Sequence, residues 1–116
     1  MQEHKMKLMP EYFDYIKNGT KRIEVRLNDE KRQLIHIGDY ITFEKVSDEP
    51  EYLKVQVTDL YYESSFSNLL DKYDMALFAN NDITKEELLN VLDKFYTKEE
   101  QDKYGVVGIR IEKATK

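Results

Sequence analysis

The sequence predicts an α+β fold in which a small mixed β-barrel has helices packed around its rim. Two observations favour this fold class: segments whose apolar and polar residues alternate, as in strands, and segments whose apolar residues recur at helical spacing. The two kinds of segment are interleaved at uneven intervals, which indicates helices inserted between the strands of one sheet. No linker rich in proline, glycine or serine divides the chain, so we expect a single domain over residues 1–116.

The first predicted elements are a strand and a helix that meet at a proline. Residues 5–9 predict a short strand, and Pro10 suits the first turn of a helix because its missing N–H is not needed there. One face of this helix carries three apolar residues, Tyr12, Phe13 and Ile16. The pair Asn18 and Gly19 predicts the end of the helix, where a left-handed backbone conformation is common.

Residues 21–27 show the clearest strand alternation in the chain. One face is apolar and consists of Ile23, Val25 and Leu27. The opposite face is polar and consists of Arg22, Glu24 and Arg26. This pattern predicts a half-buried strand whose polar face is open to solvent.

A β-hairpin is predicted after a polar, irregular segment over residues 28–37. The glycine–aspartate pair at 38–39 predicts a turn before a strand over residues 40–45. A second turn over 47–51 precedes a long strand pattern over 52–61. The short connection predicts that these two strands pair in antiparallel orientation.

The second half of the sequence predicts three helices and a final strand. Residues 65–73 have apolar residues at helical spacing, with Ser64 or Ser65 available as the N-cap. Two capping boxes, in each of which a threonine is followed three residues later by a glutamate, predict two more helix starts: Thr84 with Glu87, and Thr97 with Glu100. Residues 106–112 alternate as a terminal strand.

Composition excludes several kinds of site. The chain has no cysteine, which rules out disulfides, thiolate nucleophiles and cysteine-based zinc sites. Its two histidines, His4 and His36, lie in different segments without metal-ligand spacing, so we expect surface residues and no metal. Because Gly105 and Gly108 precede a strand rather than a helix, we also expect no nucleotide cofactor. We expect a cytoplasmic protein without a membrane span, since no apolar run approaches the roughly 20 residues required.

The net charge of −5 is unevenly distributed. Residues 1–45 hold nine Lys or Arg and eight Asp or Glu, giving +1, whereas residues 46–116 hold nine against fifteen, giving −6. Six basic residues against three acidic ones lie between residues 17 and 32. An acidic protein is poorly suited to sequence-independent binding along a duplex, because that binding depends on clustered positive charge. The local excess leaves room for a small cleft that takes one nucleotide or a short single strand.

The basic segment contains the pattern G-x-K-x-x-E-x-R, formed by Gly19, Lys21, Glu24 and Arg26. A carboxylate between an ammonium and a guanidinium group stays ionised and can accept a hydrogen bond from a base amine, while the arginine remains available for phosphate or base contact. The alternative is an exposed ion-pair ladder, which contributes little to stability.

This pattern, preceded by PEYFDYIKNG and followed by GDYITF, resembles the activating-signal-cointegrator homology (ASCH) domain, a relative of the PUA fold. The blocks YESSFSNLL at 62–70 and YGVVGIRI at 104–111 are also similar to the family, so the resemblance covers most of the chain. It implies a β-barrel with a cleft for RNA or a modified nucleoside, lined by the four motif residues. Five tyrosines are candidates for a base-stacking platform: Tyr61, Tyr62, Tyr73, Tyr96 and Tyr104. Tyr62 and Tyr104 are singled out because they lie in these blocks.

The same resemblance allows an enzyme. One branch of ASCH-like proteins hydrolyses the acetyl amide of 4-acetylcytidine with a lysine, a threonine nucleophile and a glutamate. Lys21 matches that lysine, but Glu24 stands at the threonine position. Another family member is described as a ribonuclease, and Lys21 and Glu24 would be the catalytic pair in either enzyme. We rank binding of RNA or a modified nucleoside above catalysis because the nucleophile is replaced. A third hypothesis is that the chain is a module that binds a protein or a small metabolite.

Overall fold

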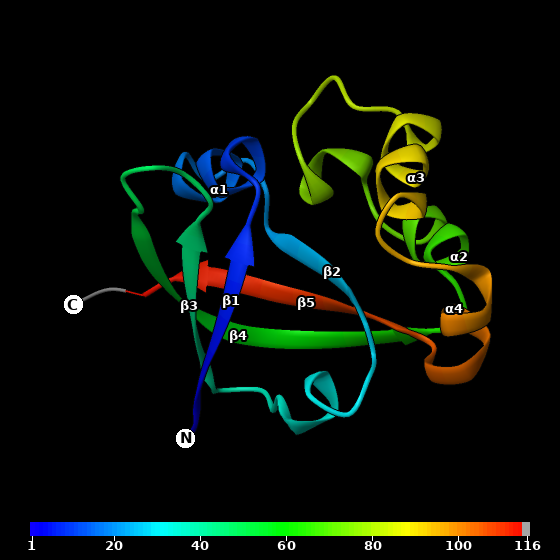
Figure 1. Ribbon diagram of the computed structural model, residues 1–116, viewed down its shortest axis with the longest axis horizontal. Helices are drawn as coiled ribbons and strands as arrows, with labels where there is room; N and C mark the ends of the chain where they lie inside the picture. Colours follow the sequence, from blue (N-terminus) through cyan, green and yellow to red (C-terminus); the bar gives the residue numbers. More distant parts are fainter. Residues whose placement is uncertain (115–116) are drawn as a thin grey trace.

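The computed structural model describes residues 1–114 and contains one mixed five-stranded sheet (Figure 1). The strands are β1 (Glu3–Leu8), β2 (Ile23–Leu27), β3 (Tyr40–Lys45), β4 (Tyr52–Glu63) and β5 (Val106–Lys113). Their order in the sheet is β1-β3-β4-β5-β2. The β1–β3 pair is parallel, and β3–β4, β4–β5 and β5–β2 are antiparallel. The sheet is a half-barrel, with β1 and β2 as its two edge strands.

Within residues 1–114, four α-helices are packed around this sheet. They are α1 (Pro10–Lys17), α2 (Phe66–Asp71), α3 (Lys85–Asp93) and α4 (Lys98–Tyr104). Figure 1 shows α1 beside the ends of β1 and β3, whereas α2, α3 and α4 gather at the other end of the sheet. No helix within residues 1–114 is long and apolar enough to cross a membrane. The predicted class, a mixed barrel-like sheet with helices around it, is confirmed.

The helix ends follow the chemistry that the sequence predicts. Thr84 and Thr97 each accept a hydrogen bond from the backbone of the glutamate three residues later, and both capping boxes are complete. Ser65, one of the two predicted candidates, caps α2. Gly19 follows α1 with a φ of 90°, as expected for a helix that ends in the left-handed region.

The structure differs from the predicted elements in two respects. Two short 3₁₀ turns, η1 (Arg32–Leu34) and η2 (Met75–Phe78), were not predicted, because turns of three or four residues leave no periodic pattern. The polar face of β2 was expected to be open to solvent, and this expectation is wrong. Glu24 is only 5% exposed, because other elements of the chain cover this face.

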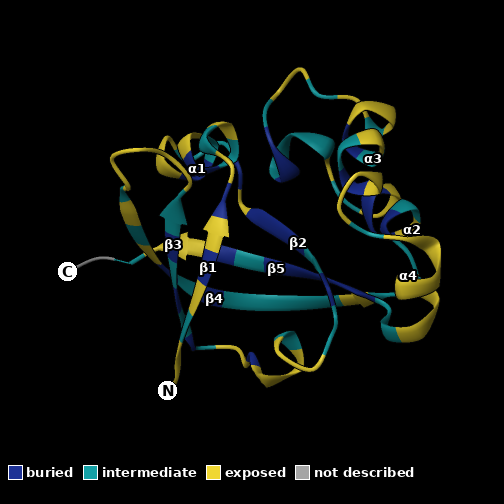
Figure 2. Cartoon of the chain, viewed as in Figure 1, coloured by how far each residue is buried: buried dark blue, intermediate teal, exposed yellow. Residues whose placement is uncertain are grey.

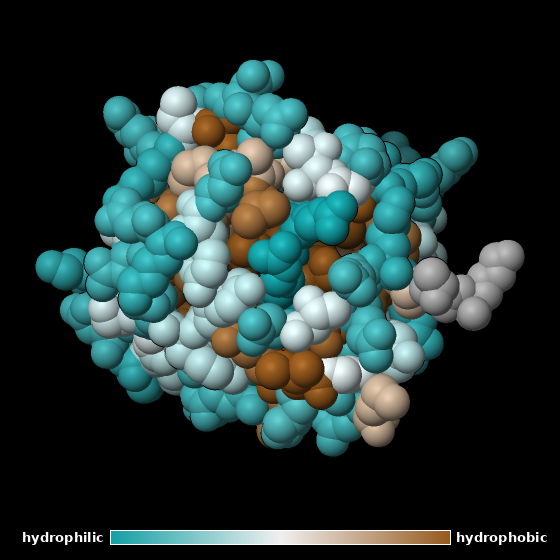
Figure 3. All heavy atoms as spheres, turned by 180° about the vertical axis from the view of Figure 1, so that it is seen from behind, coloured by the Kyte–Doolittle hydropathy of each residue, from teal (hydrophilic) through white to brown (hydrophobic). Residues whose placement is uncertain are grey.

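Apolar side chains form two clusters on the two sides of the sheet, with buried positions along most strands (Figure 2). Phe13 and Phe43 belong to the first cluster, and Phe66 and Phe78 to the second. Gly108 in β5 allows close packing in the second cluster, since a Cβ there would lie 3.2 Å from a methyl group of Leu69. On the face turned away from the viewer in Figure 1, small hydrophobic areas are separated by hydrophilic side chains (Figure 3).

Asp39 ties the N-terminal segment to the loop before β3. One carboxylate oxygen accepts a hydrogen bond from the backbone N of Gln2 at 3.1 Å. The other lies 2.9 Å from His4 Nε2 and 3.0 Å from the backbone N of His36. His4 was expected on the surface, but its side chain is only 11% exposed because β1 lies beside β3, whereas His36 is exposed as expected. Burial by itself raises the pKa of the Asp39 carboxyl, but these hydrogen bonds lower it to about 2.

We expect Asp39→Asn to destabilise the protein at neutral pH and to have little effect in strong acid. A carboxyl whose pKa is lower in the folded state stabilises the fold above its unfolded pKa, near 4, and loses this contribution as the pH falls toward about 2. The loss at pH 7 should be on the order of 1 to 2 kcal/mol in the free energy of unfolding. Urea unfolding between pH 2 and pH 7 measures it.

The control is Asp48→Asn, which removes the same charge from an exposed position in the turn between β3 and β4. This variant should follow the parent protein at every pH. An Asp39→Asn variant whose stability runs parallel to that of the parent from pH 7 to pH 2 would contradict the role given to this carboxylate.

Candidate functional site

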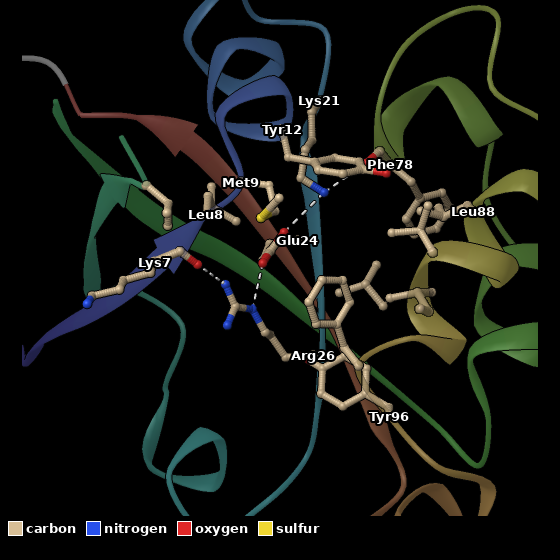
Figure 4. Close-up of a pocket in the computed structure, with 15 residues that line it drawn as sticks. Lys7, Leu8, Met9, Tyr12, Lys21, Glu24, Arg26, Phe78, Leu88 and Tyr96 are labelled. Atoms are coloured by element: carbon tan, nitrogen blue, oxygen red, sulfur yellow. Dashed lines mark hydrogen bonds and ion pairs between the residues drawn. The ribbon is translucent and has the colours of Figure 1, made fainter. Parts of the chain in front are cut away.

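A cavity of about 230 Å³ opens where the two edge strands of the half-barrel fail to meet. Its walls come from the end of β1, from α1, from β2, from η2 and from α3 with the residues that follow it (Figure 4). Three of the four motif residues line it: Lys21, Glu24 and Arg26. These three charged residues of the motif therefore face a concave site and do not form an exposed ion-pair ladder.

Lys21 lies at the entry to β2 and is 5% exposed. Its ammonium contacts three acceptors: the carbonyl oxygen of Ile23 at 2.9 Å, that of Phe78 at 2.8 Å and Glu24 Oε1 at 3.1 Å. An ammonium has three N–H donors, so all of them are used within the protein. Burial lowers the pKa of Lys21, and the charge of Glu24 offsets only part of this effect.

Glu24 lies between two cations. Its Oε1 faces the Lys21 ammonium, and its Oε2 accepts a hydrogen bond from Arg26 Nε at 2.6 Å. Burial by itself raises the pKa of the Glu24 carboxyl, but the positive charges of Lys21 and Arg26 more than offset this, and the pKa is lowered. The carboxylate is therefore ionised and acts as a bridge between the two basic groups.

Arg26 joins the two edges of the half-barrel. Its Nη2 donates to the carbonyl oxygen of Lys7 in β1 at 2.8 Å, while its Nε holds Glu24 in β2. Its side chain is 13% exposed. Burial by itself lowers the pKa of Arg26, but the charge of Glu24, the nearby Tyr96 and the hydrogen bond to Glu24 together more than offset this, and the pKa is raised. The Lys7 side chain itself extends away from the cavity in Figure 4. With all three side chains ionised, the Lys21, Glu24 and Arg26 cluster carries a charge of +1.

The rest of the cavity is mostly apolar and aromatic. Tyr12 lies beside Lys21, whose ammonium is 5.5 Å from the centre of the tyrosine ring. Tyr96 lies near Arg26 and packs against Phe66 with ring centres 5.3 Å apart. Burial raises the pKa values of both tyrosine hydroxyls, which therefore stay protonated at neutral pH. The cavity combines a charged end with apolar walls that suit a flat ring.

Three predicted site residues lie outside this cavity. Gly19 ends α1, and no atom lies within 4 Å of the position of a Cβ there, so its evident role is to terminate the helix. Tyr62 is 56% exposed near the end of β4, and Tyr104 is the last residue of α4. The structure thus brings together Lys21, Glu24 and Arg26 but does not place the other three with them.

Sequence reasoning missed most of the cavity wall. Tyr12 was assigned only to the apolar face of α1, and Phe78 and Leu88 carry no local signal that separates a cavity wall from a core. Tyr96 belonged to the wider group of stacking candidates but was not singled out. A usable signal was the number of tyrosines, nine in 116 residues, because some of their hydroxyls must reach polar surroundings.

Comparison with known proteins agrees with this fold. Residues 6–115 match the ASCH domain family. The crystal structure of the hypothetical protein PH0355 is similar with a TM-score of 0.84 and 38% identity, covering 98% of this chain and 100% of that one. The solution structure of protein PF0455 from Pyrococcus furiosus is similar with a TM-score of 0.76 and 35% identity over the whole of both chains.

A more distant structure carries the family's name. The ASCH domain from Lactobacillus crispatus is 12% identical, with a TM-score of 0.67 over 97% of this chain and 79% of that one, and it supports the fold alone. No curated protein matches the chain. The match over residues 6–115 and the shared half-barrel show that the chain belongs to the ASCH domain family, whose members are generally thought to bind RNA.

Proposed function

We propose that the cavity between β1, β2 and α3 binds one nucleobase, either in a modified nucleoside or in an unpaired position of single-stranded RNA. The observation that carries the proposal is the buried cluster of Lys21, Glu24 and Arg26 at one end of an aromatic-walled cavity. Its volume of about 230 Å³ is below the roughly 300–1,000 Å³ of sites for drug-sized ligands, which suits a single base better than an oligonucleotide.

The chemistry of the walls supports a base as ligand. RNA-binding proteins commonly recognise unstacked bases by placing them on aromatic side chains and by hydrogen-bonding to their edges. Tyr12 and Tyr96 supply aromatic surface, and the cluster supplies charged hydrogen-bond donors. A protein with a net charge of −5 gains little from long stretches of phosphate backbone, so contacts to one base would carry most of the affinity.

Binding is favoured over hydrolysis by the state of the polar groups. The Lys21 ammonium has no free donor, and Glu24 is held ionised between two cations, which weakens it as a base. None of the 15 residues that line the cavity is a serine, threonine, cysteine or histidine. An amidohydrolase that attacks through a serine or threonine hydroxyl therefore lacks its nucleophile in this cavity.

Replacing Tyr96 by leucine should weaken nucleoside or RNA binding while leaving the protein folded. Stacking of one base on an aromatic ring is worth about 1–3 kcal/mol, so we expect roughly a 5- to 150-fold loss of affinity. Calorimetric titration with nucleosides, and fluorescence anisotropy with short labelled RNAs, measure the change.

Tyr62→Leu is the matched control, because it makes the same substitution at an exposed ring outside the cavity. It should bind as the parent protein does. A loss of binding on Tyr62→Leu, with none on Tyr96→Leu, would move the binding surface to β4. A parent protein that binds no nucleoside and no RNA would refute the proposed function.

We also expect no turnover of 4-acetylcytidine and no cleavage of short RNA by the purified protein. Liquid chromatography of the nucleoside and gel analysis of the RNA measure this directly. Consumption of either substrate that is abolished by Glu24→Gln would replace the binding role by the corresponding enzyme.

A further inference from the structure

At the charged end of the cavity, one residue, Arg26, has N–H groups that are not hydrogen-bonded within the described part of the protein. The three N–H groups of Lys21 are all used by Ile23, Phe78 and Glu24. Arg26 has five N–H groups, of which one on Nε meets Glu24 and one on Nη2 meets the carbonyl oxygen of Lys7. Within residues 1–114, the remaining three, two on Nη1 and one on Nη2, find no hydrogen-bond partner.

Glu24 offers less to a ligand than Arg26 does. Each of its oxygens already faces a cation and keeps one further acceptor site, and the residue is only 5% exposed. A donor brought to this end of the cavity also approaches a cluster whose net charge is +1. We therefore expect this end of the cavity to hold a hydrogen-bond acceptor better than an amino group, and a contact between Glu24 and a base amine stays a prediction.

The orientation of Arg26 is fixed before any ligand arrives. Its guanidinium is anchored on β2 through Glu24 and on β1 through Lys7, and its side chain is largely buried. A donor that is already oriented loses little conformational entropy when it binds and discriminates well between ligand groups.

We propose that Arg26 donates a hydrogen bond to the exocyclic group of the bound base and thereby selects a carbonyl oxygen over an amino group. This inference rests on the proposed function. The ligand class is then a keto base, such as guanine, hypoxanthine or uracil, in preference to adenine. A neutral carbonyl fits this end better than a phosphate, because a single excess positive charge compensates poorly for removing a phosphate from water.

Matched nucleosides isolate this contact. Inosine and adenosine have nearly the same size and carry an oxygen or an amino group at carbon 6, while purine riboside carries no substituent there. N1 is a hydrogen-bond donor in inosine and an acceptor in the other two, so the comparison of purine riboside with adenosine tests the group on carbon 6 with N1 unchanged. We expect affinity in the order inosine, purine riboside, adenosine, with about a tenfold or greater ratio between the first and the last. Uridine should likewise bind more tightly than cytidine. Calorimetric titration of the parent protein measures all five.

Two variants test whether Arg26 is the source of the preference. Arg26→Gln should bind inosine at least about tenfold more weakly and bring the ratio of inosine to adenosine close to one. Arg26→Lys keeps the charge but not the planar donor group, and it should lose the preference as well. Arg22→Gln is the control, since Arg22 is exposed in the same segment and should keep the parent ratio. A thermal melt confirms that each variant is folded.

The possible results separate this inference from the proposed function. Tight binding of nucleosides with no preference for inosine would refute the selection of a carbonyl group by Arg26, but it would agree with the proposed binding site. A preference that survives in folded Arg26→Gln would also refute this selection by Arg26. If the 5′-monophosphates of inosine and adenosine bind equally well, and Arg26→Gln removes only their advantage over the nucleosides, Arg26 binds phosphate instead. If no nucleoside binds at all, both the proposed function and this inference fail.

Discussion

The constraint on which this site depends is that three charged side chains of one segment are removed from water together. Lys21 and Glu24 are each 5% exposed, and the side chain of Arg26 is 13% exposed. An isolated buried charge costs several kcal/mol, and such a cost is offset only where partners and hydrogen bonds are well placed. Here the two cations meet the two oxygens of one carboxylate, and backbone carbonyls take the remaining donors of Lys21.

Those backbone partners make the cluster a link between distant segments. Lys21 binds the carbonyl of Phe78 in η2, and Arg26 binds the carbonyl of Lys7 in β1, although the strands β1 and β2 share no backbone ladder in the described part of the chain. The gap in the half-barrel is thus crossed by a side chain instead of a sheet hydrogen bond. The same gap gives the cavity its opening, so the closure of the fold and the floor of the site depend on the same residues.

The sequence predicts those features of the structure that depend on residues close together in the chain, and it does not predict those that depend on contacts between distant segments. The alternation in residues 21–27, the capping box at Thr84 and the glycine that ends α1 are local signals, and each element was found where it was expected. The burial of the polar face of β2 is not local. It depends on η2 and α3, which lie more than 45 residues further along the chain, and on a parallel contact between β1 and β3 that no hairpin signal encodes.

The same distinction between local and non-local evidence applies to the residues of the candidate site. Lys21, Glu24 and Arg26 could be named because they share one short motif, but the rings beside them come from α1 and from the segment after α3. Tyr62 and Tyr104 stand in blocks that resemble the family, which is evidence of common ancestry and fold but not of position beside the motif. Knowing that a residue belongs to a strand or to a family block does not show whether its side chain points into the cavity.

The site shows which kinds of ligand the negative net charge of the protein disfavours. A net charge of −5 opposes any ligand that presents many phosphates, whereas the Lys21, Glu24 and Arg26 cluster carries +1 beside mostly apolar walls. Electrostatic attraction to a polyanion falls steeply with salt, but hydrogen bonds and stacking of one base in a cavity do not depend on counterion release. A small basic site in a protein of negative net charge therefore favours recognition of one base by its shape and its hydrogen-bonding edge, and it disfavours nonspecific attachment to nucleic acid.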